Sequence, residues 1–470
     1  MAPVLKSWMQ PTAKQDKRMS KPGNEVNRFL QTYPDTSHLD VLVIDLCGNA
    51  IGKRLPAVAI ESVFRQGTPV CGAMQLVDVM GNTADPMGYG FSDGDPDAFA
   101  VPIAGTLRPV PWLAANKSQV LCEFVSSSDG KPLWYEPRQV LKKVIRKFSE
   151  LGLTPKLAVE LEFYLLAPQR GDDGAPIAAA SPRTGITESS GKVLSLDKLD
   201  EFDRVLGAIE SACALQGIPT TSMISEYGAG QFEVNLQHQN DPLLAADHAA
   251  LLRRAVQGVS RSLGYDASFM SKPFDDQSGN GMHIHLSLSD KDGNNLFNPE
   301  ASEGDVKLSQ AVGGLQATLA EAMAIFAPNL NVYRRFKPDE FVPVTTDWGD
   351  NNRSVAFRIP PSDAANRRIE HRVSGAEANP YLVIAAVLAG VHHGLSKKLD
   401  AGEKHGGNAG AEVDPNLPMT LWQALAAIRQ ASILTGYFGD DYLQIYAGVK
   451  QAEFDAFMGT IHPREHEWYL

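Results

Sequence analysis

Cysteine is scarce in this chain, with four residues among 470, and no two of them have the Cys-x-x-Cys spacing. That spacing is typical of structural zinc sites and thioredoxin-like redox centres, so the sequence argues against both. The cysteines are far apart and mostly flanked by apolar residues. We expect reduced thiols in the core of a cytoplasmic protein, at Cys47, Cys71, Cys122 and Cys213.

Long hydrophobic runs and an excess of positive charge are missing too. The longest apolar run, Leu382–Val391, is far too short to cross a bilayer, and the polar stretch Met1–Asn24 lacks the apolar segment of a signal peptide. The formal net charge is −12. This balance argues against nucleic acid or an anionic membrane as a partner and is compatible with a cationic ligand.

The length allows two or three domains, and 43% hydrophobic with 21% charged residues is typical of a globular protein. We expect a mobile tail at 1–23, a first domain at 24–135 with short strands, and a second domain at 136–470. The boundary follows the turn-rich segment Ser126–Pro132, where Pro137 suits the first turn of a helix. In the second domain we expect helices at 137–151, 197–215, 243–263, 308–326, 378–398 and 419–432.

Five segments of the chain combine polar residues on one face of an expected strand with apolar residues on the other. In Val159–Leu165, Glu160 and Glu162 share one face, while Leu161 and Phe163 share the opposite face. The other four are Gln231–Gln237 with Glu233, Met282–Leu288 with His283, His285 and Ser287, Ser354–Pro360 with Arg358, and Arg368–Val373 with Glu370 and Arg372.

Each of these segments alone has a simpler interpretation, a half-exposed strand with a solvated polar face. Solvated strands normally carry Lys, Thr and Ser, whereas these polar faces consist mainly of Glu, His, Arg, Asn and Gln and contain no Lys. If the faces converge, several carboxylates lie close together and need cations to stay ionised. Oxygen-rich ligation with a single imidazole favours Mg²⁺ or Mn²⁺ over zinc.

Arginines in the C-terminal half supply the opposite charge. Guanidinium groups bind carboxylate and phosphate oxygens bidentately. Metals beside arginines suit phosphoryl transfer from ATP, which depends on positioning and charge neutralisation. The residues alone therefore predict a metal-dependent, nucleotide-using enzyme with an anionic co-substrate, and they leave the acceptor open. The arginines are Arg335, Arg353, Arg358, Arg368 and Arg372.

Residues 40–470 resemble the glutamine synthetase family, whose motifs occur here in the family's order. The motifs are Glu160-Leu-Glu162, Glu226-Tyr-Gly-Ala-Gly-Gln-Phe-Glu233, Gly281-Met-His-Ile-His-Leu-Ser287, Asn331-Val-Tyr-Arg-Arg335, Asn352-Arg-Ser-Val-Ala-Phe-Arg-Ile-Pro360, Arg368-Ile-Glu370 and Asn379-Pro-Tyr-Leu382. The resemblance implies an α+β fold with a small β-grasp-like N-terminal domain. It also implies a catalytic domain with a curved antiparallel sheet and surrounding helices, and a homo-oligomer of two stacked hexameric rings with active sites between subunits.

The resemblance also implies a site for ATP, glutamate and two Mg²⁺ or Mn²⁺ ions. One ion is expected at Glu162, Glu226 and Glu233, and the other at Glu160, His283 and Glu370. Glutamate is expected at Arg335, Arg372 and the backbone of Gly279, with Ser278 in place of the usual Asn. The phosphates are expected at Arg353, Arg358 and Arg368, with Arg353 also catalytic, and the nucleotide near His285 and Ser287.

Two departures from the family pattern fall on the ammonia site and leave the metal and phosphate sets whole. Residues 90–97 lack the family's Ser-Ser, and Phe341 stands where a flap Glu is expected, with Glu340 one residue early. The chain is most similar to the γ-glutamylpolyamine (γ-glutamylputrescine) synthetase branch. Asp93 and Glu340 are then candidates for the acidic residue that deprotonates the amine, and Asp95, Asp97 and Phe341 for amine binding.

The expected activity is an ADP-forming glutamate–amine ligase that works through a γ-glutamyl phosphate and takes putrescine or another polyamine. Three alternatives stay open. The acceptor could be ethanolamine or a monoamine, the chain could be a genuine ammonia-using glutamine synthetase, or it could be a catalytically inactive relative. Persistence of all six metal ligands argues against the last. The exact amine, the number of rings and any regulation are not fixed by the sequence.

Overall fold

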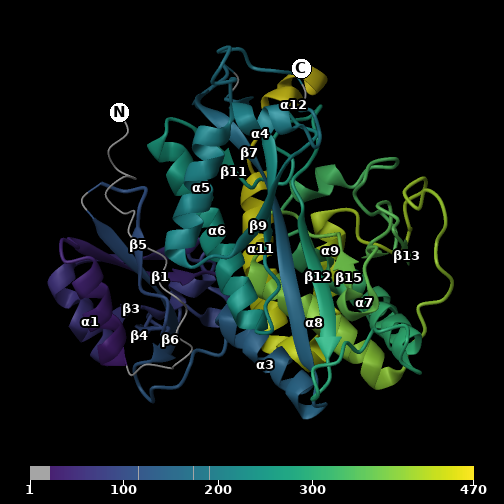
Figure 1. Cartoon of the computed structure of the whole chain (residues 1–470), viewed down its shortest axis with the longest axis horizontal. Helices are drawn as coiled ribbons and strands as arrows, with labels where there is room; N and C mark the ends of the chain where they lie inside the picture. The colour runs from purple at the N-terminus through teal and green to yellow at the C-terminus, as the bar shows by residue number, and fades with distance from the viewer. Residues whose placement is uncertain (1–21, 115, 173, 190) are drawn as a thin grey trace.

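The computed structural model describes residues 22–470 apart from 115, 173 and 190, so the predicted tail at 1–23 falls almost wholly outside the described residues. The first part of the chain forms a six-stranded sheet in the order β2-β1-β6-β4-β3, with β5 on β6 (Figure 1). β1 runs parallel to β6, whereas the other pairs are antiparallel. The elements are α1 (Pro22–Thr32), β1 (His38–Ile44), β2 (Ala50–Pro56), α2 (Ile60–Gln66), β3 (Thr68–Cys71), β4 (Asp97–Pro102), β5 (Arg108–Val110) and β6 (Lys117–Ser126).

Strand β1 is buried on both faces, which explains its continuous apolar run. Val41 and Val43 lie in a smaller core with residues of α1 and α2. Leu42 and Ile44 lie in the larger core that fills the rest of the molecule. Since the two parts of the chain share this larger core, the boundary proposed at residue 136 stays a prediction.

The second sheet is larger and carries the candidate site. Its strand order is β13-β14-β15-β12-β7-β10-β9, with β8 and β11 also paired to β7. The predicted α+β class is confirmed, although the sheet is mixed because β13 runs parallel to β14. The strands are β7 (Thr154–Arg170), β8 (Pro176–Ala178), β9 (Thr220–Ser225), β10 (Gln231–Leu236), β11 (Asp266–Ser268), β12 (Met282–Ser289), β13 (Trp348–Asp350), β14 (Phe357–Ile359) and β15 (Ile369–His371).

Two predicted strands are shorter than the sequence pattern indicated. The segment Ser354–Pro360 is a strand only at β14, because Ser354 bonds to the side chain of Asn352 in a turn, through its amide at 3.0 Å and its hydroxyl at 2.7 Å. In Arg368–Val373 only β15 is paired as a strand, and Arg368 and Arg372 flank it. The alternation of faces does not by itself show where a ladder of hydrogen bonds ends.

Two long helices that accompany the large sheet begin at capping side chains. Asp241 caps α6 by accepting from the amides of Leu243 and Leu244, and Asn379 caps α8 in the same way. The helix predicted at 197–215 is two helices, which meet at Phe202. The helices are α3 (Pro137–Glu150), α4 (Leu196–Glu201), α5 (Asp203–Gln216), α6 (Pro242–Ser262), α7 (Gly304–Phe326), α8 (Pro380–Lys397), α9 (Leu421–Arg429), α10 (Thr435–Phe438), α11 (Asp440–Met458) and α12 (Pro463–Tyr469).

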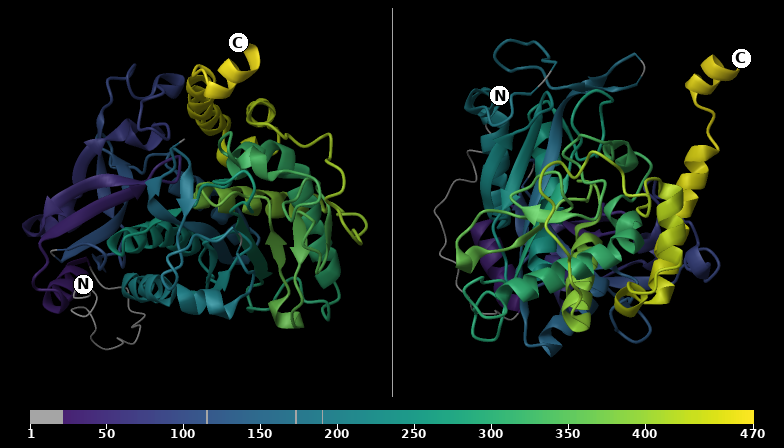
Figure 2. Two further views of the ribbon diagram at one scale, coloured as in Figure 1. Left: turned by 90° about the horizontal axis from the view of Figure 1, so that it is seen from above. Right: turned by 90° about the vertical axis from the view of Figure 1, so that its right-hand side faces the viewer.

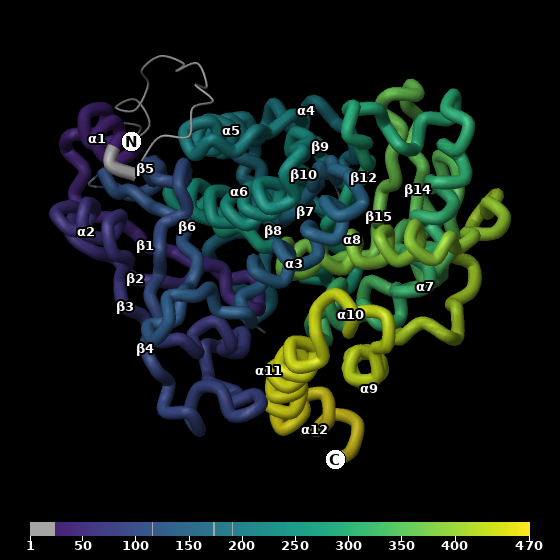
Figure 3. Tube along the Cα trace, turned by 90° about the horizontal axis from the view of Figure 1, so that it is seen from below, coloured from purple at the N-terminus to yellow at the C-terminus, as the bar shows by residue number. Residues whose placement is uncertain are grey.

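The helices form a layer behind the large sheet, with α3 and α6 packed on β7 and α8 packed on α3, α6 and α7. Figure 3 shows α9, α10, α11 and α12 gathered on one side of this layer, and Figure 2 shows α12 projecting beyond the rest of the chain. Within the described residues, no helix combines the length and apolar character needed to cross a bilayer.

Two of the cysteines depart from the expectation of core thiols. Cys122 and Cys213 are buried, whereas Cys47 is half-buried and Cys71 is exposed. Strand β3 alternates between buried and exposed positions, so Cys71 faces solvent while its neighbour Val70 faces the smaller core.

Candidate active site

The register of the large sheet places the polar residues from its strands next to one another. Neighbouring strands carry them at paired positions, so the side chains project from the same face. The paired residues are Glu233 with Glu162, Glu160 with His283, His285 with Glu370, and Glu370 with Arg358. The convergence of the polar faces predicted from the sequence is therefore present in the structure.

The opposite face of the same strands is apolar and buried. Leu161 and Phe163 of β7, Val234 of β10, and Ile284 and Leu286 of β12 all belong to the larger core. Burying this face fixes the register, because a slip by one residue would exchange the carboxylates with the core side chains. The core therefore holds the polar face in place.

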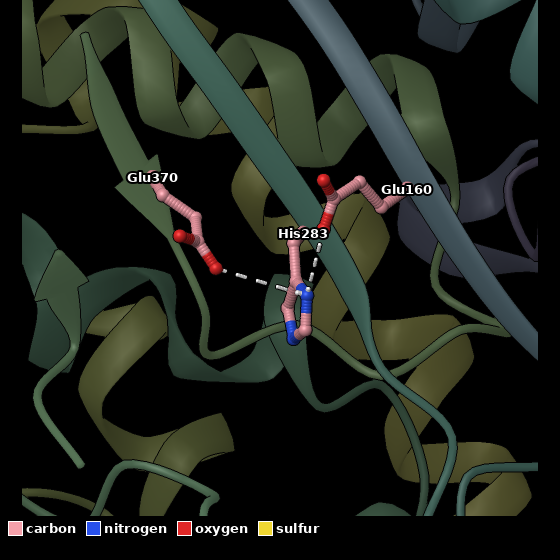
Figure 4. A group of neighbouring side chains, drawn as sticks. All are labelled: Glu160, His283 and Glu370. Carbon is pink, nitrogen blue, oxygen red and sulfur yellow. Dashed lines mark hydrogen bonds and ion pairs between the residues drawn. The ribbon is translucent and has the colours of Figure 1, made fainter. Parts of the chain in front are cut away.

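Two groups of three side chains have ligand atoms within 4.8 Å of one another and could each hold a metal ion. The first is Glu160, His283 and Glu370 (Figure 4). In it, His283 Nδ1 lies 3.3 Å from a Glu160 oxygen and 4.0 Å from a Glu370 oxygen. The second is Glu162, Glu233 and His283, so His283 belongs to both groups.

Glu226 lies beside these groups but is in neither of them among the described residues. Burial, followed by the charge of Glu162, raises the pKa of Glu226 to about 7. Burial and the charges of Glu160, Glu162 and Glu226 likewise raise the pKa of Glu233. Both shifts show that negative charge on this side of the site is poorly compensated by the protein itself.

The other side of the site is compensated by cationic side chains. Burial alone would raise the pKa of Glu370, but Arg372 and the two histidines outweigh it and lower the pKa to about 2. Arg358 donates to Glu370 at 2.6 Å, and Arg372 also bonds to it. Burial would likewise raise the pKa of Glu160, but His285 and His283 outweigh it and lower the pKa. His285 Nε2 lies 2.7 Å from a Glu160 oxygen.

The residues fit divalent cations. Four buried or half-buried carboxylates and one imidazole make up the two groups, and a raised pKa at Glu233 marks a place where added positive charge would be favourable. Oxygen-rich donors with one nitrogen suit Mg²⁺ or Mn²⁺. The assignment of Glu226 to one of the ions stays a prediction.

The two arginines predicted to bind glutamate lie at one end of the carboxylate row. Arg335 is buried, and its Nη1 donates to the carbonyl of Val373 at 3.4 Å. Arg372 bonds to Glu370 and to the carbonyl of Phe341. Among the described residues, the Nε–H groups of both arginines are buried without a partner, which suits binding of an anion.

Gly279 allows close packing beside Arg335. A Cβ at this position would lie 2.7 Å from Arg335 Cγ and 2.7 Å from the carbonyl oxygen of Ser271, so only glycine fits without displacement. The preceding carbonyl, that of Ser278, accepts from the hydroxyl of Tyr164 at 2.7 Å. The roles of Gly279 and Ser278 in binding glutamate stay predictions.

The residues predicted to bind nucleotide lie beside the same row, where Arg358 shares Glu370 with Arg372. Arg368 Nε donates to His285 Nδ1 at 3.0 Å, which makes His285 an acceptor at that nitrogen. Arg358 bonds to both Glu370 and Asn351, at 2.6 and 2.9 Å, and keeps a buried Nε–H without a partner in the described chain. Arg353 is exposed, and Ser287 is buried on β12.

The segment 337–343 carries the two residues that replace the usual flap acid. Its backbone is held by a hydrogen bond from the amide of Asp339 to the carbonyl of Gly410 at 2.9 Å. Glu340 is half-buried, and its charge acts on Arg335 and on Lys272. Phe341 is 61% exposed, and its carbonyl accepts from Arg372. Both residues therefore lie near the glutamate end of the row.

The segment 90–97 lies in the first part of the chain, and its three aspartates are exposed. Asp93 accepts from the amides of Gly90 and Asp95 at 2.9 Å, and Asp95 accepts from the amide of Ala73 at 3.2 Å. Neither metal group in the described residues includes Asp93, Asp95 or Asp97. Within one chain, Asp93 orders its own loop and Asp95 ties that loop to Ala73.

Comparison with known proteins decides the family. A family model described as "Glutamine synthetase, catalytic domain" matches residues 134–469. The chain belongs to the glutamine synthetase family. It is 37% identical over 97% of its length to gamma-glutamylputrescine synthetase PuuA of Escherichia coli (strain K12), covering 96% of that protein. It is 32% identical over 95% of its length to glutamate–isopropylamine ligase of a Pseudomonas species, covering 97% of it.

Solved structures share the fold of this glutamine synthetase family member. A structure titled "GmaS/ADP complex-Conformation 1" superposes with a TM-score of 0.80 at 26% identity, covering 94% of this chain and 99% of that one. A structure titled "Apo GmaS without ligand" gives a TM-score of 0.79 at 27% identity, covering 93% of this chain and 97% of that one. The chain is thus an ATP-dependent ligase of a family that uses divalent cations.

One exposed residue of the site was not singled out by the sequence reasoning. Tyr227 follows Glu226 directly, is 51% exposed, and lies with its ring centroid 6.5 Å from that of Phe341. Its signal in the sequence is an aromatic residue next to a predicted metal ligand. The carboxylates of the same motif give no indication of where this ring lies.

Proposed function

We propose that this chain joins the γ-carboxyl of glutamate to a polyamine such as putrescine, at the expense of ATP. The proposal rests on the position of Phe341. This aromatic residue is exposed at the flap position, and its carbonyl accepts a hydrogen bond from Arg372 of the predicted glutamate site. An aromatic ring there suits an alkylamine better than ammonium. The likeness to a gamma-glutamylputrescine synthetase supports the same acceptor.

The first step transfers the γ-phosphoryl group of ATP to the γ-carboxylate of glutamate. Arg335 and Arg372 hold glutamate by its carboxylates, while Arg353, Arg358 and Arg368 offset the charge of the phosphates. Divalent cations bound at the two carboxylate groups would add charge neutralisation to the same step. The resulting γ-glutamyl phosphate carries phosphate as its leaving group.

The second step is attack of the amine on the γ-glutamyl phosphate. With a pKa near ~10.4, an alkylamine is uncharged in roughly one molecule in 10³ at neutral pH, so the enzyme must remove a proton. Glu340 is the nearer candidate base, because its charge already acts on Arg335. Asp93 is the second candidate and requires a neighbouring subunit, since it is exposed on a different part of the chain.

We further propose a cytoplasmic homo-oligomer of two stacked hexameric rings with active sites between subunits. The exposed position of the 90–97 loop supports a role across such a junction. An isologous or ring interface would supply these carboxylates to a neighbour without any change of fold.

Phosphate release measured across a panel of amines tests the function. The panel is ammonium, isopropylamine, ethanolamine, putrescine and spermidine, each with glutamate, ATP and Mg²⁺, and mass spectrometry identifies the amide. We expect the highest kcat/KM with putrescine or spermidine. A preference for isopropylamine or ethanolamine would assign a monoamine ligase instead, and a preference for ammonium, with polyamines inert at millimolar concentration, would assign a plain glutamine synthetase.

A further inference from the structure

The turn between β9 and β10 presents an aromatic side chain to solvent beside the carboxylate row. Tyr227 lies in this turn, next to Glu226, and is 51% exposed. Its ring faces Phe341, which comes from a distant segment and is 61% exposed. The two centroids lie 6.5 Å apart with 31° between the ring planes. Two large aromatic rings therefore meet in solvent beside a polar site.

The backbone under Tyr227 is held firmly, so the exposure of its ring is not that of a loose loop. The carbonyl of Tyr227 accepts from the amide of Gly191 at 2.8 Å. The next amide, of Gly228, donates to Gln231 at 2.9 Å, and a Cβ on Gly228 would lie 1.9 Å from the Tyr164 hydroxyl. A turn held in this way fixes the backbone from which the Tyr227 ring projects.

Phe341 is connected to the first metal group through its backbone carbonyl. Its carbonyl accepts from Arg372, and Arg372 bonds to Glu370 of the first metal group. Tyr227 is attached to Glu226, whose carboxylate lies beside the second group. The aromatic pair thus joins a residue that directly follows Glu226 to a residue whose backbone is bonded to Arg372.

We propose that Tyr227 and Phe341 together form the wall that recognises the carbon chain of the acceptor amine. This inference rests on the proposed function and adds Tyr227 as a residue that determines specificity. The ring faces bury methylene groups of a primary alkylamine and attract its ammonium group, whereas ammonium itself has no carbon chain to bury. The preference for an alkylamine over ammonium therefore grows with the length of the alkylamine's carbon chain.

Single and double alanine variants measured against amines of increasing length test the inference. The amines are ammonium, ethylamine, butylamine and putrescine. Each methylene in an apolar site is worth about 10-fold or more in kcat/KM, so Tyr227→Ala should lower kcat/KM for butylamine and putrescine about 10-fold and change it less than about 3-fold for ammonium. Because the rings act together, Tyr227→Ala with Phe341→Ala should lose less than the product of the single losses.

Two further variants separate specificity from folding. Tyr227→Phe keeps the ring and should keep the dependence on chain length. Trp422→Ala removes another paired exposed ring, 61% exposed and 6.2 Å from Phe454, and should change no kinetic constant. The proposed aromatic wall would be wrong if Tyr227→Ala lowered kcat/KM equally for ammonium and butylamine. It would also be wrong if the loss in the double variant equalled the product of the single losses.

The outcome is distinguishable from failure of the proposed function. If wild type forms no γ-glutamyl amide with any amine, the proposed function is wrong. If wild type prefers polyamines and Tyr227→Ala leaves the dependence on chain length unchanged, the function stands and the inference on Tyr227 is wrong.

Discussion

Glu233 lies directly opposite Glu162 where β10 pairs with β7, so two carboxylates project from neighbouring positions on one face of the sheet. Asn235 donates to Glu233 at 3.1 Å, and the amide of Gly281 donates to Glu162 at 2.6 Å. These bonds orient both groups but add no full positive charge. The burial of Glu233 and the charges around it raise its pKa, which a bound cation would reverse.

Removal of either carboxylate should abolish turnover while the fold persists. Glu162→Ala and Glu233→Ala are each expected to lose about 10²-fold or more in kcat, because either change unbalances a group built around divalent charge. Phosphate release gives the activity. Thermal unfolding with and without Mg²⁺ gives the binding, and the stabilisation by Mg²⁺ seen in wild type should shrink.

Glu210→Ala on the exposed face of α5 serves as the matched control and should behave as wild type. Retention of more than about a tenth of wild-type activity by both site variants would contradict the two-metal assignment.

Gly279→Ala should weaken glutamate binding more than ATP binding. The new Cβ would meet Arg335 Cγ and the Ser271 carbonyl at 2.7 Å, so the guanidinium must shift. We expect KM for glutamate to rise about 10-fold or more, with KM for ATP changed less than about 3-fold. Gly207→Ala is the control, since its Cβ would meet only Asp203 at 3.8 Å. Equal increases in both KM values would argue against Arg335 as a glutamate ligand.

Much of the site could be predicted because its residues are carried by strands whose faces alternate. From spacing alone, Glu160 and Glu162 could be placed on one face of their strand and Glu233 on the polar face of another, and the register in the structure pairs them with His283 and with one another. The apolar residues between them then had to form the core. Family motifs added what spacing does not contain, namely a prediction of which carboxylates share an ion.

The remainder depends on contacts between distant segments, which periodicity does not report. The pairing of Tyr227 with Phe341 arises from a turn and a loop, where no repeating pattern indicates direction. The double role of Glu370, in a metal group and bonded to Arg358 and Arg372, likewise follows from strand neighbours that the sequence does not order. Cys71 was wrongly expected in the core because its apolar neighbours do not reveal which face of β3 it occupies.

Replacement of Glu136 by Gln should flatten the dependence of stability on pH. Glu136 is buried at the start of α3, and its burial, followed by the charge of Glu123, raises its pKa from 4.5 to about 8. Between these values the folded chain keeps a proton that the unfolded chain has lost. The free energy of unfolding therefore falls as pH rises through this window, by up to about 1.4 kcal/mol per pH unit from this group.

Glutamine mimics the protonated carboxyl and can still accept from the amide of Phe124. Glu136→Gln should match wild type near pH 5 and exceed its melting temperature increasingly towards pH 8, as measured by circular dichroism. Glu150→Gln, at the exposed end of the same helix, should follow wild type at every pH. Parallel curves for wild type and Glu136→Gln would show that Glu136 is ionised throughout.

Mixed oligomers should show whether active sites are shared between subunits. Asp93→Ala alters the exposed 90–97 loop, and Glu233→Ala alters the carboxylate row, so each uniform assembly should be nearly inactive. If the loop of one subunit completes the site of its neighbour, oligomers that contain both variants hold some sites with an intact loop and an intact row.

Co-expression with two affinity tags and sequential purification would isolate these mixed oligomers, and light scattering would report their size. Phosphate release should return in part. A mixed ring that stays inactive, or a fully active monomer, would place the whole site within one chain, and wild-type activity in the uniform Asp93→Ala assembly would remove Asp93 from the reaction.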